Sequence, residues 1–398
     1  MARFPPLSER PLEKMRKKRL SLETCAGHVE VRVYYGKDPV TGQWICPMRV
    51  RWGLEPYQRM SPVLEERLCS TAVETGNYES AARVAQTWGA PITDSTIHSH
   101  VQTIGQKAQA HAERRASRAL EPATRAEVVA QAKRDLPDVF DLVIMLDGWM
   151  SRERGEEWGL KPADRKAERV AWHEMKTGIV FRLDQRGETQ GGRRVLLEKF
   201  VEMYRGEPFE FGQRLYALAL RQGLYQARRV FVVADGAVWI WNLVEERFGS
   251  AVEGTLDFYH ACEHLWTVGR ELFGKEDEVR QWVEPLLHKM RHGGEAAVLK
   301  KLEQTLGRAQ REGSSSLDVV RRETNYFREH REHMHYEKWA DQGIPIGSGA
   351  MESTCGQFQT RLKGPGKFWT AQGKDNIAAL DIARRNHEWE FDFWGIAV

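Results

Sequence analysis

The chain has 398 residues, with 59 lysines and arginines against 56 aspartates and glutamates, and 41% of its residues are hydrophobic. This length fits two or three domains with a sizeable core, and the 14 tryptophans, 15 phenylalanines and 10 tyrosines exclude disorder as the main state. No apolar run reaches the roughly 18 residues of a membrane span. The basic N-terminus lacks the apolar region of a secretory signal.

The cysteines and the charge distribution indicate the compartment and the kind of partner. Five scattered cysteines with no CxxC pair argue against a disulfide framework or a cysteine-only zinc site, so a cytoplasmic location is expected. Residues 1–20 carry seven basic and two acidic groups, and residues 106–134 carry seven and three. Such segments suggest a polyanionic partner, although a solvated tail and a solvated helix would have the same composition.

Residues 1–60 are predicted to form a basic tail and a β-hairpin, because residues 28–35 and 44–52 alternate between apolar and polar side chains around a turn-rich segment. Residues 61–136 are predicted to form helices. A break at residues 89–91 is followed by apolar residues at helical spacing, Ile97, Val101 and Ile104. This is the pattern of a helix-turn-helix, and also of an ordinary helical hairpin.

The second helix of that pair carries small polar side chains that could reach base edges or phosphates. The predicted DNA contacts are Ser95, Thr96, His98, Ser99 and Gln102. A linker helix follows, with an interruption at Pro122, and ends before Pro137. The third predicted region, residues 137–398, begins there.

From Pro137 onward the pattern is α/β. Buried runs at 139–146 and 229–234 each predict a strand that ends in an Asp-Gly pair, at Asp147 and Asp235. Open α/β sheets place their active sites at the carboxyl ends of central strands. Two carboxylates on neighbouring strands repel each other unless a cation lies between them, and oxygen ligands favour Mg²⁺ or Mn²⁺ over zinc.

A third acid, Glu352, falls in the first turn of a predicted helix that begins near Gly349, with Ser348 as its cap. The helix dipole would stabilise its ionised form. The core-facing stripe of this helix is Met351, Cys355, Phe358 and Leu362. Singly, an Asp-Gly pair marks a turn, and a glutamate near a helix start is a capping partner. The ordered set of three acids is more specific.

This order, strand with Asp147, strand with Asp235, helical stretch and helix with Glu352, resembles the DDE transposases, whose catalytic core is RNase H-like. Within this group, the amino-acid sequences of residues 235–240, 257–265 and 345–353 resemble those of the transposases of the Kra-type family of bacterial insertion sequences. The family implies an α/β, RNase H-like catalytic core with a helical insertion at about 265–340, preceded by the hairpin and the helix-turn-helix.

The same resemblance implies an activity and its partners. Asp147, Asp235 and Glu352 would bind Mg²⁺ or Mn²⁺, two ions per site, and catalyse cleavage and strand transfer at a phosphodiester. The partner would be double-stranded DNA, at the inverted repeats of the element and at the target. A homodimer or larger synaptic assembly at the bacterial nucleoid, with no membrane association, is expected from this mechanism.

Two weaker groups could support such a site. His260 and His264 lie four residues apart beside Asp257, and the three could orient the catalytic carboxylates or replace one as a ligand. A zinc site is not favoured, because no partner motif is evident. Arg361, Lys363 and Lys367 lie in a Gly-rich segment with aromatics, which could bind DNA phosphates or form a turn around a core tryptophan. Histidines 330, 333 and 335 are expected on a solvated face.

Three rival functions stay open. An RNase H-like nuclease would hydrolyse DNA without strand transfer. A domesticated or inactive derivative would only bind DNA through the helix-turn-helix. A transcription regulator with a ligand-binding α/β domain is disfavoured by three acids at one sheet edge, because small-molecule pockets are mostly apolar.

Overall fold

The structure, a computed structural model, describes residues 11–161, 169–192 and 194–394. It divides into two compact units, Met1–His111 with Thr370–Val398, and Ala112–Trp369. This division differs from the predicted boundaries, because the last helix groups with the N-terminal segments and not with the α/β region. The first ten residues of the predicted basic tail lie outside the described residues.

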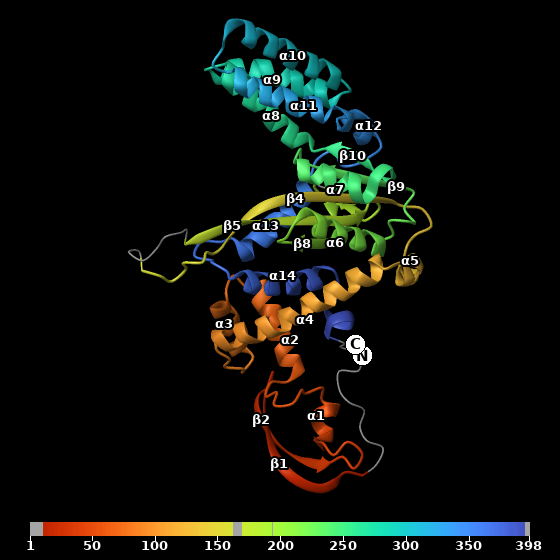
Figure 1. Cartoon of the computed structure of the whole chain (residues 1–398), viewed down its shortest axis with the longest axis vertical. Helices are drawn as coiled ribbons and strands as arrows, with labels where there is room; N and C mark the ends of the chain where they lie inside the picture. The colour runs from red at the N-terminus through yellow and green to blue at the C-terminus, as the bar shows by residue number, and fades with distance from the viewer. Residues whose placement is uncertain (1–10, 162–168, 193, 395–398) are drawn as a thin grey trace. The chain divides into compact units, whose positions relative to one another are not determined.

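A five-stranded mixed sheet lies at the centre of the unit Ala112–Trp369, in the order β10-β9-β4-β5-β8 (Figure 1). β5 is antiparallel to both of its neighbours, β4 and β8, whereas β9 runs parallel to β4 and β10 runs parallel to β9. The strands are β4 (Asp141–Arg154), β5 (Val170–Arg182), β8 (Phe200–Tyr204), β9 (Arg229–Ala234) and β10 (Glu253–Leu256), with a separate pair β6 (Arg186–Glu188) and β7 (Arg194–Leu196). The prediction of a mixed α/β fold is confirmed.

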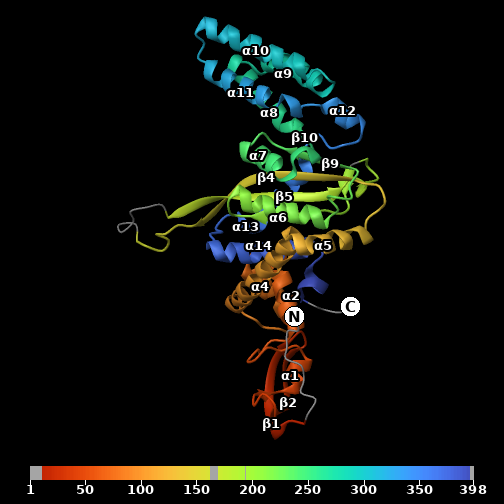
Figure 2. The ribbon, with the colours of Figure 1, turned by 45° about the vertical axis from the view of Figure 1, so that its right-hand side comes forward.

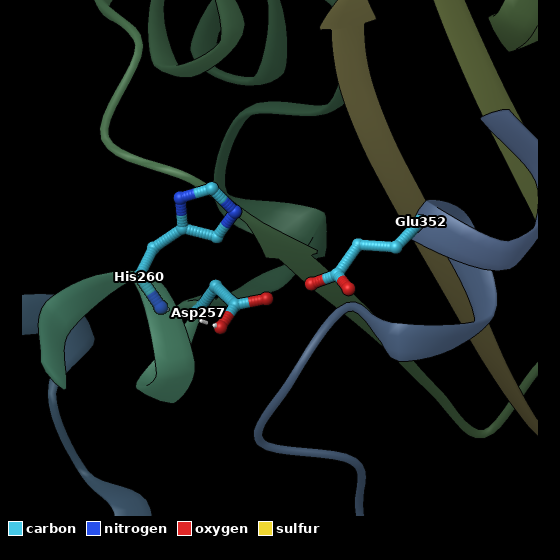
Figure 3. Close-up of side chains that lie close together, drawn as sticks. All are labelled: Asp257, His260 and Glu352. Atoms are coloured by element: carbon cyan, nitrogen blue, oxygen red, sulfur yellow. Dashed lines mark hydrogen bonds between the residues drawn. The ribbon is translucent and has the colours of Figure 1, made fainter. Parts of the chain in front are cut away.

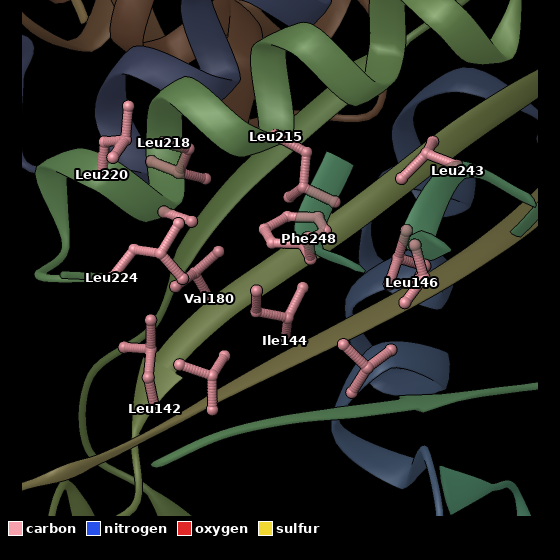
Figure 4. Packing of buried hydrophobic residues seen from close by; sticks show 14 of the residues in the cluster. Leu142, Ile144, Leu146, Val180, Leu215, Leu218, Leu220, Leu224, Leu243 and Phe248 are labelled. Carbon is pink, nitrogen blue, oxygen red and sulfur yellow. The ribbon is translucent and has the colours of Figure 1, made fainter. Parts of the chain in front are cut away.

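β4 and β9 are the central strands, and their side chains are buried on both faces. Residues 142–146 and 230–234 are almost fully inaccessible. Leu142, Ile144 and Leu146 pack with Val180 and Leu215 in the main hydrophobic cluster (Figure 4). Each leucine-sized side chain buried in this way contributes about 1.5–3 kcal/mol. The continuous apolar runs read from the sequence are therefore those of strands covered on two sides.

Helices cover both faces of this sheet. α6 (Pro208–Arg221) and α7 (Val238–Phe248) contribute to the cluster that contains Leu146, and η2 (Gly249–Ala251) follows α7. α13 (Gly349–Leu362) contacts β4 and β5, and its Cys355 hydrogen-bonds with Asp147, whose side chain points away from that of Leu146. The predicted stripe of α13 is confirmed as buried: Met351, Cys355, Phe358 and Leu362.

β4 does not end at Asp147, as the sequence predicted, but continues to Arg154. Its pairing with β9 stops at Leu146, whereas its pairing with β5 continues to the end of the strand. An Asp-Gly pair usually marks a turn or bulge, but here β5 supplies hydrogen bonds on one side and keeps the strand extended. Asp147 is thus the first residue of β4 beyond the parallel pairing.

Between β10 and α13 the chain forms a helical insertion, as predicted (Figure 2). Its elements are α8 (Phe258–Leu272), α9 (Glu276–Arg291), α10 (Glu295–Glu312), α11 (Leu317–Glu329), η3 (Arg331–His333) and α12 (Tyr336–Asp341). The apolar faces of these helices form a second hydrophobic cluster that includes Leu265 and Phe327. α10 ends at Gly313, whose φ of 60° is a left-handed conformation that glycine adopts without strain.

In the other unit the predicted hairpin has different strands. β1 (Glu13–Thr24) pairs antiparallel with β2 (Gly27–Lys37), so the described part of the basic tail is itself a strand. Of the predicted strand at 44–52, only β3 (Trp44–Ile45) is present, and α1 (Pro47–Arg51) follows it. Proline cannot donate to a strand ladder, but it fits the first turn of a helix, which explains why this part of the prediction was wrong.

The rest of that unit is helical. Its elements are α2 (Pro62–Glu74), α3 (Tyr78–Thr87), α4 (Asp94–Leu120), α14 (Ala371–Arg385) and η4 (Trp389–Trp394). α5 (Pro122–Arg134) follows α4, so the predicted interruption at Pro122 is confirmed. Ile97, Val101 and Ile104 are buried as predicted. Gly105 lets α14 approach α4 closely, since a Cβ there would lie 2.5 Å from the Cβ of Asn376.

In the described part of the chain, no helix combines the length and the apolar character that a bilayer span requires. The five cysteines, all of them among the described residues, are free thiols.

Asp141, the first residue of β4, is buried and forms ion pairs with two more exposed arginines. Arg228 donates to its carboxylate oxygens at 2.9 and 2.7 Å, and Arg229 donates at 2.7 Å. The hydrogen bonds from Arg228, with further help from Arg229, lower the pKa of Asp141 to about 2. The pair fixes the beginning of β4 next to the beginning of β9.

Asp141→Asn is expected to lower the free energy of unfolding by about 1–2 kcal/mol at pH 7, because the pKa of Asp141 is lower in the folded state than the ordinary value of about 3.9. This contribution is present above about pH 4 and is lost as the pH falls through about 2, so the two proteins should converge in acid. Urea denaturation at several pH values measures the difference. The control, Asp184→Asn, removes a more exposed pair with Arg182 at 3.3 Å and should change little. Equal losses in both variants would contradict the assignment.

Candidate active site

Four carboxylates come together from four elements at one edge of the sheet. Asp147 lies in β4 just beyond its pairing with β9, and Asp235 directly follows β9. Asp257 follows β10 and caps α8, and Glu352 lies in the first turn of α13. Because β4, β9 and β10 are parallel, the residues that follow their parallel pairing lie at the same edge.

Asp257 is fully buried and joins three segments of the chain. Its Oδ1 accepts hydrogen bonds from the backbone N–H groups of Tyr259 at 2.6 Å and His260 at 3.1 Å. Its Oδ2 accepts from the N–H of Ser348 at 2.6 Å, at the start of α13. The carboxylate therefore ties the end of β10 and the start of α8 to the helix that carries Glu352. Ser348 is the N-cap residue of α13, as predicted, but its side chain makes no capping hydrogen bond.

Asp257, His260 and Glu352 form a compact group of possible metal ligands (Figure 3). Their ligand atoms all lie within 4.8 Å of one another. Two ligands on opposite sides of a divalent cation, at about 2.0–2.4 Å each, are separated by about that distance, so the three could share one ion. Among the residues that the structure describes, this is the one group of three or more that meets the distance, and the predicted set Asp147, Asp235 and Glu352 does not.

The surroundings of Asp147 disfavour its ionised form. Burial, and secondly the charge of Asp235, raise its pKa above the ordinary value. The N–H of Gly148 at 2.6 Å and the thiol of Cys355 partly offset this by donating to the carboxylate. A cation would remove both causes of the shift, because it would replace the lost hydration and neutralise the pair.

The loop of Asp235 is held by the helical insertion. The Asp235 carboxylate accepts a hydrogen bond from the backbone N–H of Ala237 at 3.0 Å. The backbone carbonyl oxygen of Asp235 accepts one from the indole N–H of Trp241 at 2.8 Å. From α11, the ring of Tyr326 packs on Gly236, and His330 lies 3.2 Å from the carbonyl oxygen of Gly236. A Cβ at Gly236 would overlap the Tyr326 ring, so the packing of the insertion requires a glycine at this position.

Gly148 has a different neighbour. A Cβ at this position would overlap the carboxylate end of Glu174 on β5 and lie 3.3 Å from Trp239. Glu174 forms an ion pair with Lys176 at 2.9 Å. Since the end of a glutamate side chain moves easily, Gly148 is less constrained than Gly236.

The remaining histidines are engaged elsewhere. His264, predicted as an alternative ligand, forms an ion pair with Glu323 of α11 and stacks on Tyr326 at 3.7 Å, so it lies outside the group of Asp257, His260 and Glu352. The expected solvated face for His330 and His333 is wrong. His330 is buried, His333 stacks on Trp241 at 4.0 Å, and burial lowers the pKa of both.

The predicted DNA-contacting residues divide into exposed and internal ones. Ser95, His98 and Ser99 are exposed, and Thr96 is half-buried. Gln102 is also half-buried, and its side-chain oxygen accepts from Asn376 at 2.7 Å, so it is used within its own unit.

In the last turn of α13, Arg361 is buried with its guanidinium 4.9 Å from the ring of Trp369, so this predicted DNA contact lies inside the fold. Lys367 donates to the carbonyl oxygen of Thr360 at 2.6 Å, and partial burial lowers its pKa. Lys363 remains half-exposed.

No family model and no curated protein matches this chain. Among solved structures, the chain is similar to one described as a Drosophila P element transposase strand transfer complex. The two share 12% sequence identity, with 86% of this chain and 96% of that chain covered, at a TM-score of 0.38. A TM-score of this size does not support a conclusion about fold or function. The carboxylates at the edge of the sheet are the basis for the function proposed below.

Sequence reasoning undervalued Asp257 and missed Tyr326. The position of Asp257 directly after β10, like that of Asp235 after β9, was a usable signal that both belong to the same sheet edge. Tyr326 offers no such signal, because its closeness to Gly236 follows only from the packing of α11.

Without divalent cations, Asp147→Asn is expected to raise the thermal midpoint of the protein, because it removes a buried charge that both burial and Asp235 disfavour. The variant should also lose the stabilisation that Mn²⁺ gives the wild type. In the wild type, that stabilisation should weaken as the pH falls, since a raised pKa means that a proton competes with the cation. Differential scanning fluorimetry with EDTA or Mn²⁺ checks this. Glu352→Gln, at an exposed position, should lose the cation effect without a gain in EDTA, and a loss of stability for Asp147→Asn in EDTA would contradict the assignment.

Gly236→Ala should impair cation binding and activity more than Gly148→Ala. The first Cβ meets the partly buried ring of Tyr326 and must displace α11 or the Asp235 loop, whereas the second meets a flexible glutamate end. Mn²⁺ titration by calorimetry compares the two variants. If Tyr326→Ala restores binding to Gly236→Ala, the contact is established, and the reverse ranking of the two glycines would refute it.

Proposed function

We propose that this chain is a DDE-type transposase that binds insertion-sequence ends and carries out divalent-cation-dependent DNA cleavage and strand transfer. The observation that carries the proposal is the gathering of Asp147, Asp235, Asp257 and Glu352 at one edge of the sheet. Carboxylates so placed repel one another, and a divalent cation is the usual means of stabilising them. A negatively charged site that holds cations suits phosphodiester chemistry.

The strand order supports an RNase H-like core. Three antiparallel strands, β8, β5 and β4, are followed across the sheet by the parallel strands β9 and β10. This is the order expected of RNase H-like folds, and it supports the resemblance found in the sequence. In it, acids after the first and fourth strands of the core meet, as Asp147 and Asp235 do here.

The carboxylates offer two places for a cation. Asp147 and Asp235 are close enough for their charges to interact, and Asp257, His260 and Glu352 form the compact group. We therefore propose two Mg²⁺ or Mn²⁺ ions per site, with the oxygen-rich ligands that these ions prefer. When bound, such ions supply Lewis-acid stabilisation of the charge that develops on the phosphodiester.

The residues of the chain have distinct roles in this proposal. Glu352 is exposed and could face the DNA, while the buried Asp257 fixes the start of its helix through Ser348. Because one Asp257 oxygen accepts two hydrogen bonds and the other accepts one, the aspartate positions this region as much as it binds an ion. Tyr326 and His330 position the backbone that carries Asp235.

Recognition of the DNA ends is assigned to the start of α4, where Ser95, His98 and Ser99 are exposed. Strand transfer joins two DNA ends to a target, so a homodimer or larger assembly belongs to the proposal. The proposed location is the bacterial nucleoid.

The test uses the full chain, a plasmid that carries the terminal inverted repeats of the element, and Mg²⁺ or Mn²⁺. The wild type should release strands with free 3′-OH ends and join them to target DNA. Asp147→Asn, Asp235→Asn and Glu352→Gln should each lower the cleavage rate by about 100-fold or more. Glu253→Gln is the matched control, because Glu253 is an acid at the other end of β10 and pairs with Lys338.

The products separate the rival functions. Cleavage without joined products would favour a nuclease. DNA binding without cation binding or cleavage in the wild type would favour an inactive DNA-binding derivative, and would overturn the proposal.

A further inference from the structure

β4 and β5 extend beyond the rest of the sheet as a two-stranded ribbon. Pairing of β4 with β9 ends at Leu146, and pairing of β5 with β8 ends at Lys176 opposite Tyr204. From there to Arg154 and Val170 the two strands pair with each other, and beyond this ladder β4 has one isolated parallel bridge, from Glu153 to Trp369 (Figure 1). An isolated two-stranded ribbon is marginally stable in water, so side-chain contacts must hold it.

Arginines and aromatic rings alternate along this ribbon. The guanidinium of Arg152 lies 5.9 Å from the ring of Trp172 and 5.1 Å from that of Phe368. Arg154 and Arg169 lie 5.5 and 4.6 Å from the ring of Trp158, which itself packs on Phe368 at 4.8 Å. Each contact stabilises the ribbon by about 0.5–1 kcal/mol.

The segment 363–369 is fixed alongside the ribbon. Arg152 donates to the carbonyl oxygens of Lys363 at 3.1 Å and Gly364 at 3.2 Å. Arg154 donates through its side chain to Phe368 and through its backbone N–H to Trp369 at 2.8 Å. The ribbon and this segment therefore form one preorganised surface, here called the arm surface: Arg152, Arg154, Trp158, Arg169, Trp172, Lys363 and Phe368.

The arm surface is positive and partly apolar. Trp172 is 50% exposed and neighbouring Met150 is 44% exposed, although both are large hydrophobic residues. Of the nearby acids, Glu153 is buried between Arg205 and His173, and Glu174 pairs with Lys176. Glu156 is exposed and Glu157 is half-buried in the turn before Trp158. The four basic groups of the arm surface (Arg152, Arg154, Arg169 and Lys363) outnumber these two acids, so the surface has a net positive charge.

We propose that the arm surface binds an unpaired stretch of the DNA strand that runs through the active site. Trp172 stacks on a base, while Arg169 and Lys363 contact phosphates. Exposed aromatics beside basic groups suit single strands, since every base has a flat face and every linkage a charge. This inference rests on the proposed function. It adds that the DNA bound at the active site has an unpaired strand.

The distance between Asp147 and Arg152 along β4 indicates how far the unpaired stretch lies from the reacting phosphate. Arg152 is five residues beyond Asp147, or about 17 Å at about 3.3 Å per strand residue. This corresponds to roughly five nucleotides of a DNA strand at about 3.4 Å each. The unpaired stretch is therefore expected to lie about five nucleotides from the phosphate that reacts.

The test measures binding of a labelled oligothymidine, and of a random-sequence duplex of equal length, to the full chain in EDTA. Trp172→Ala should weaken binding of the single strand about tenfold, with a much smaller effect on the duplex, and Trp172→Phe should retain most of the affinity. Arg169→Gln should reduce the salt dependence of single-strand binding by about 0.7 in the logarithmic slope. Tyr225→Ala is the matched control, since Tyr225 is 56% exposed and follows α6, near the other end of β4.

Unchanged single-strand affinity in Trp172→Ala would overturn the proposal, and so would an equal loss for duplex and single strand. A change in oligomeric state in Trp172→Ala would show that the arm surface is an interface between copies, and would also overturn it. Asp147→Asn should not weaken binding of the oligothymidine, because it removes a negative charge from the site and leaves the arm surface intact. If Asp147→Asn keeps cleavage activity while the arm variants lose binding, the catalytic assignment fails and the arm proposal stands.

Discussion

The carboxylate of Asp257 is the contact on which the candidate site depends. It is fully buried and accepts three backbone hydrogen bonds, two from the start of α8 and one from Ser348 at the start of α13. Hydrogen bonds to a charged acceptor in a buried place are stronger than neutral ones, and removing the acceptor would leave three N–H groups unsatisfied. This one side chain therefore links the edge of the sheet, the start of the helical insertion and the helix that carries Glu352.

The other acids at this edge have different surroundings. Burial and the charge of Asp235 disfavour the ionised form of Asp147, and Glu352 is exposed. In the proposed function, divalent cations would neutralise these charges, so the cost of gathering the acids would be offset when the ions bind. The insertion supports the same edge, since Tyr326 of α11 and His330, which directly follows α11, enclose the Gly236 backbone.

The periodic elements could be predicted from the sequence, and the contacts between distant segments could not. The run 229–234 and the stripe of α13 were found because burial on two faces, or on one helical face, leaves a local pattern. The basic segment 13–24 and residues 47–51 were assigned wrongly. The first segment is a mostly polar strand, so it lacks the alternation of apolar residues by which strands are recognised. In the second segment the side chains alternate as in a strand, but Pro47 begins a helix. The burial of Arg361 against Trp369 was not foreseen, because a charged residue gives no local signal of such packing.

The sequence by itself determined the buried strand 229–234, the apolar part of β4 that leads to Asp147, the buried stripe of α13 and the position of the helical insertion, since these follow from local hydrophobic periodicity. Only the tertiary structure decided that Asp257 and His260 approach Glu352, that α11 encloses Gly236, and that α14 packs against α4. These contacts join residues that are far apart in the chain. Their geometry depends on how whole elements pack, and no short stretch of sequence encodes it.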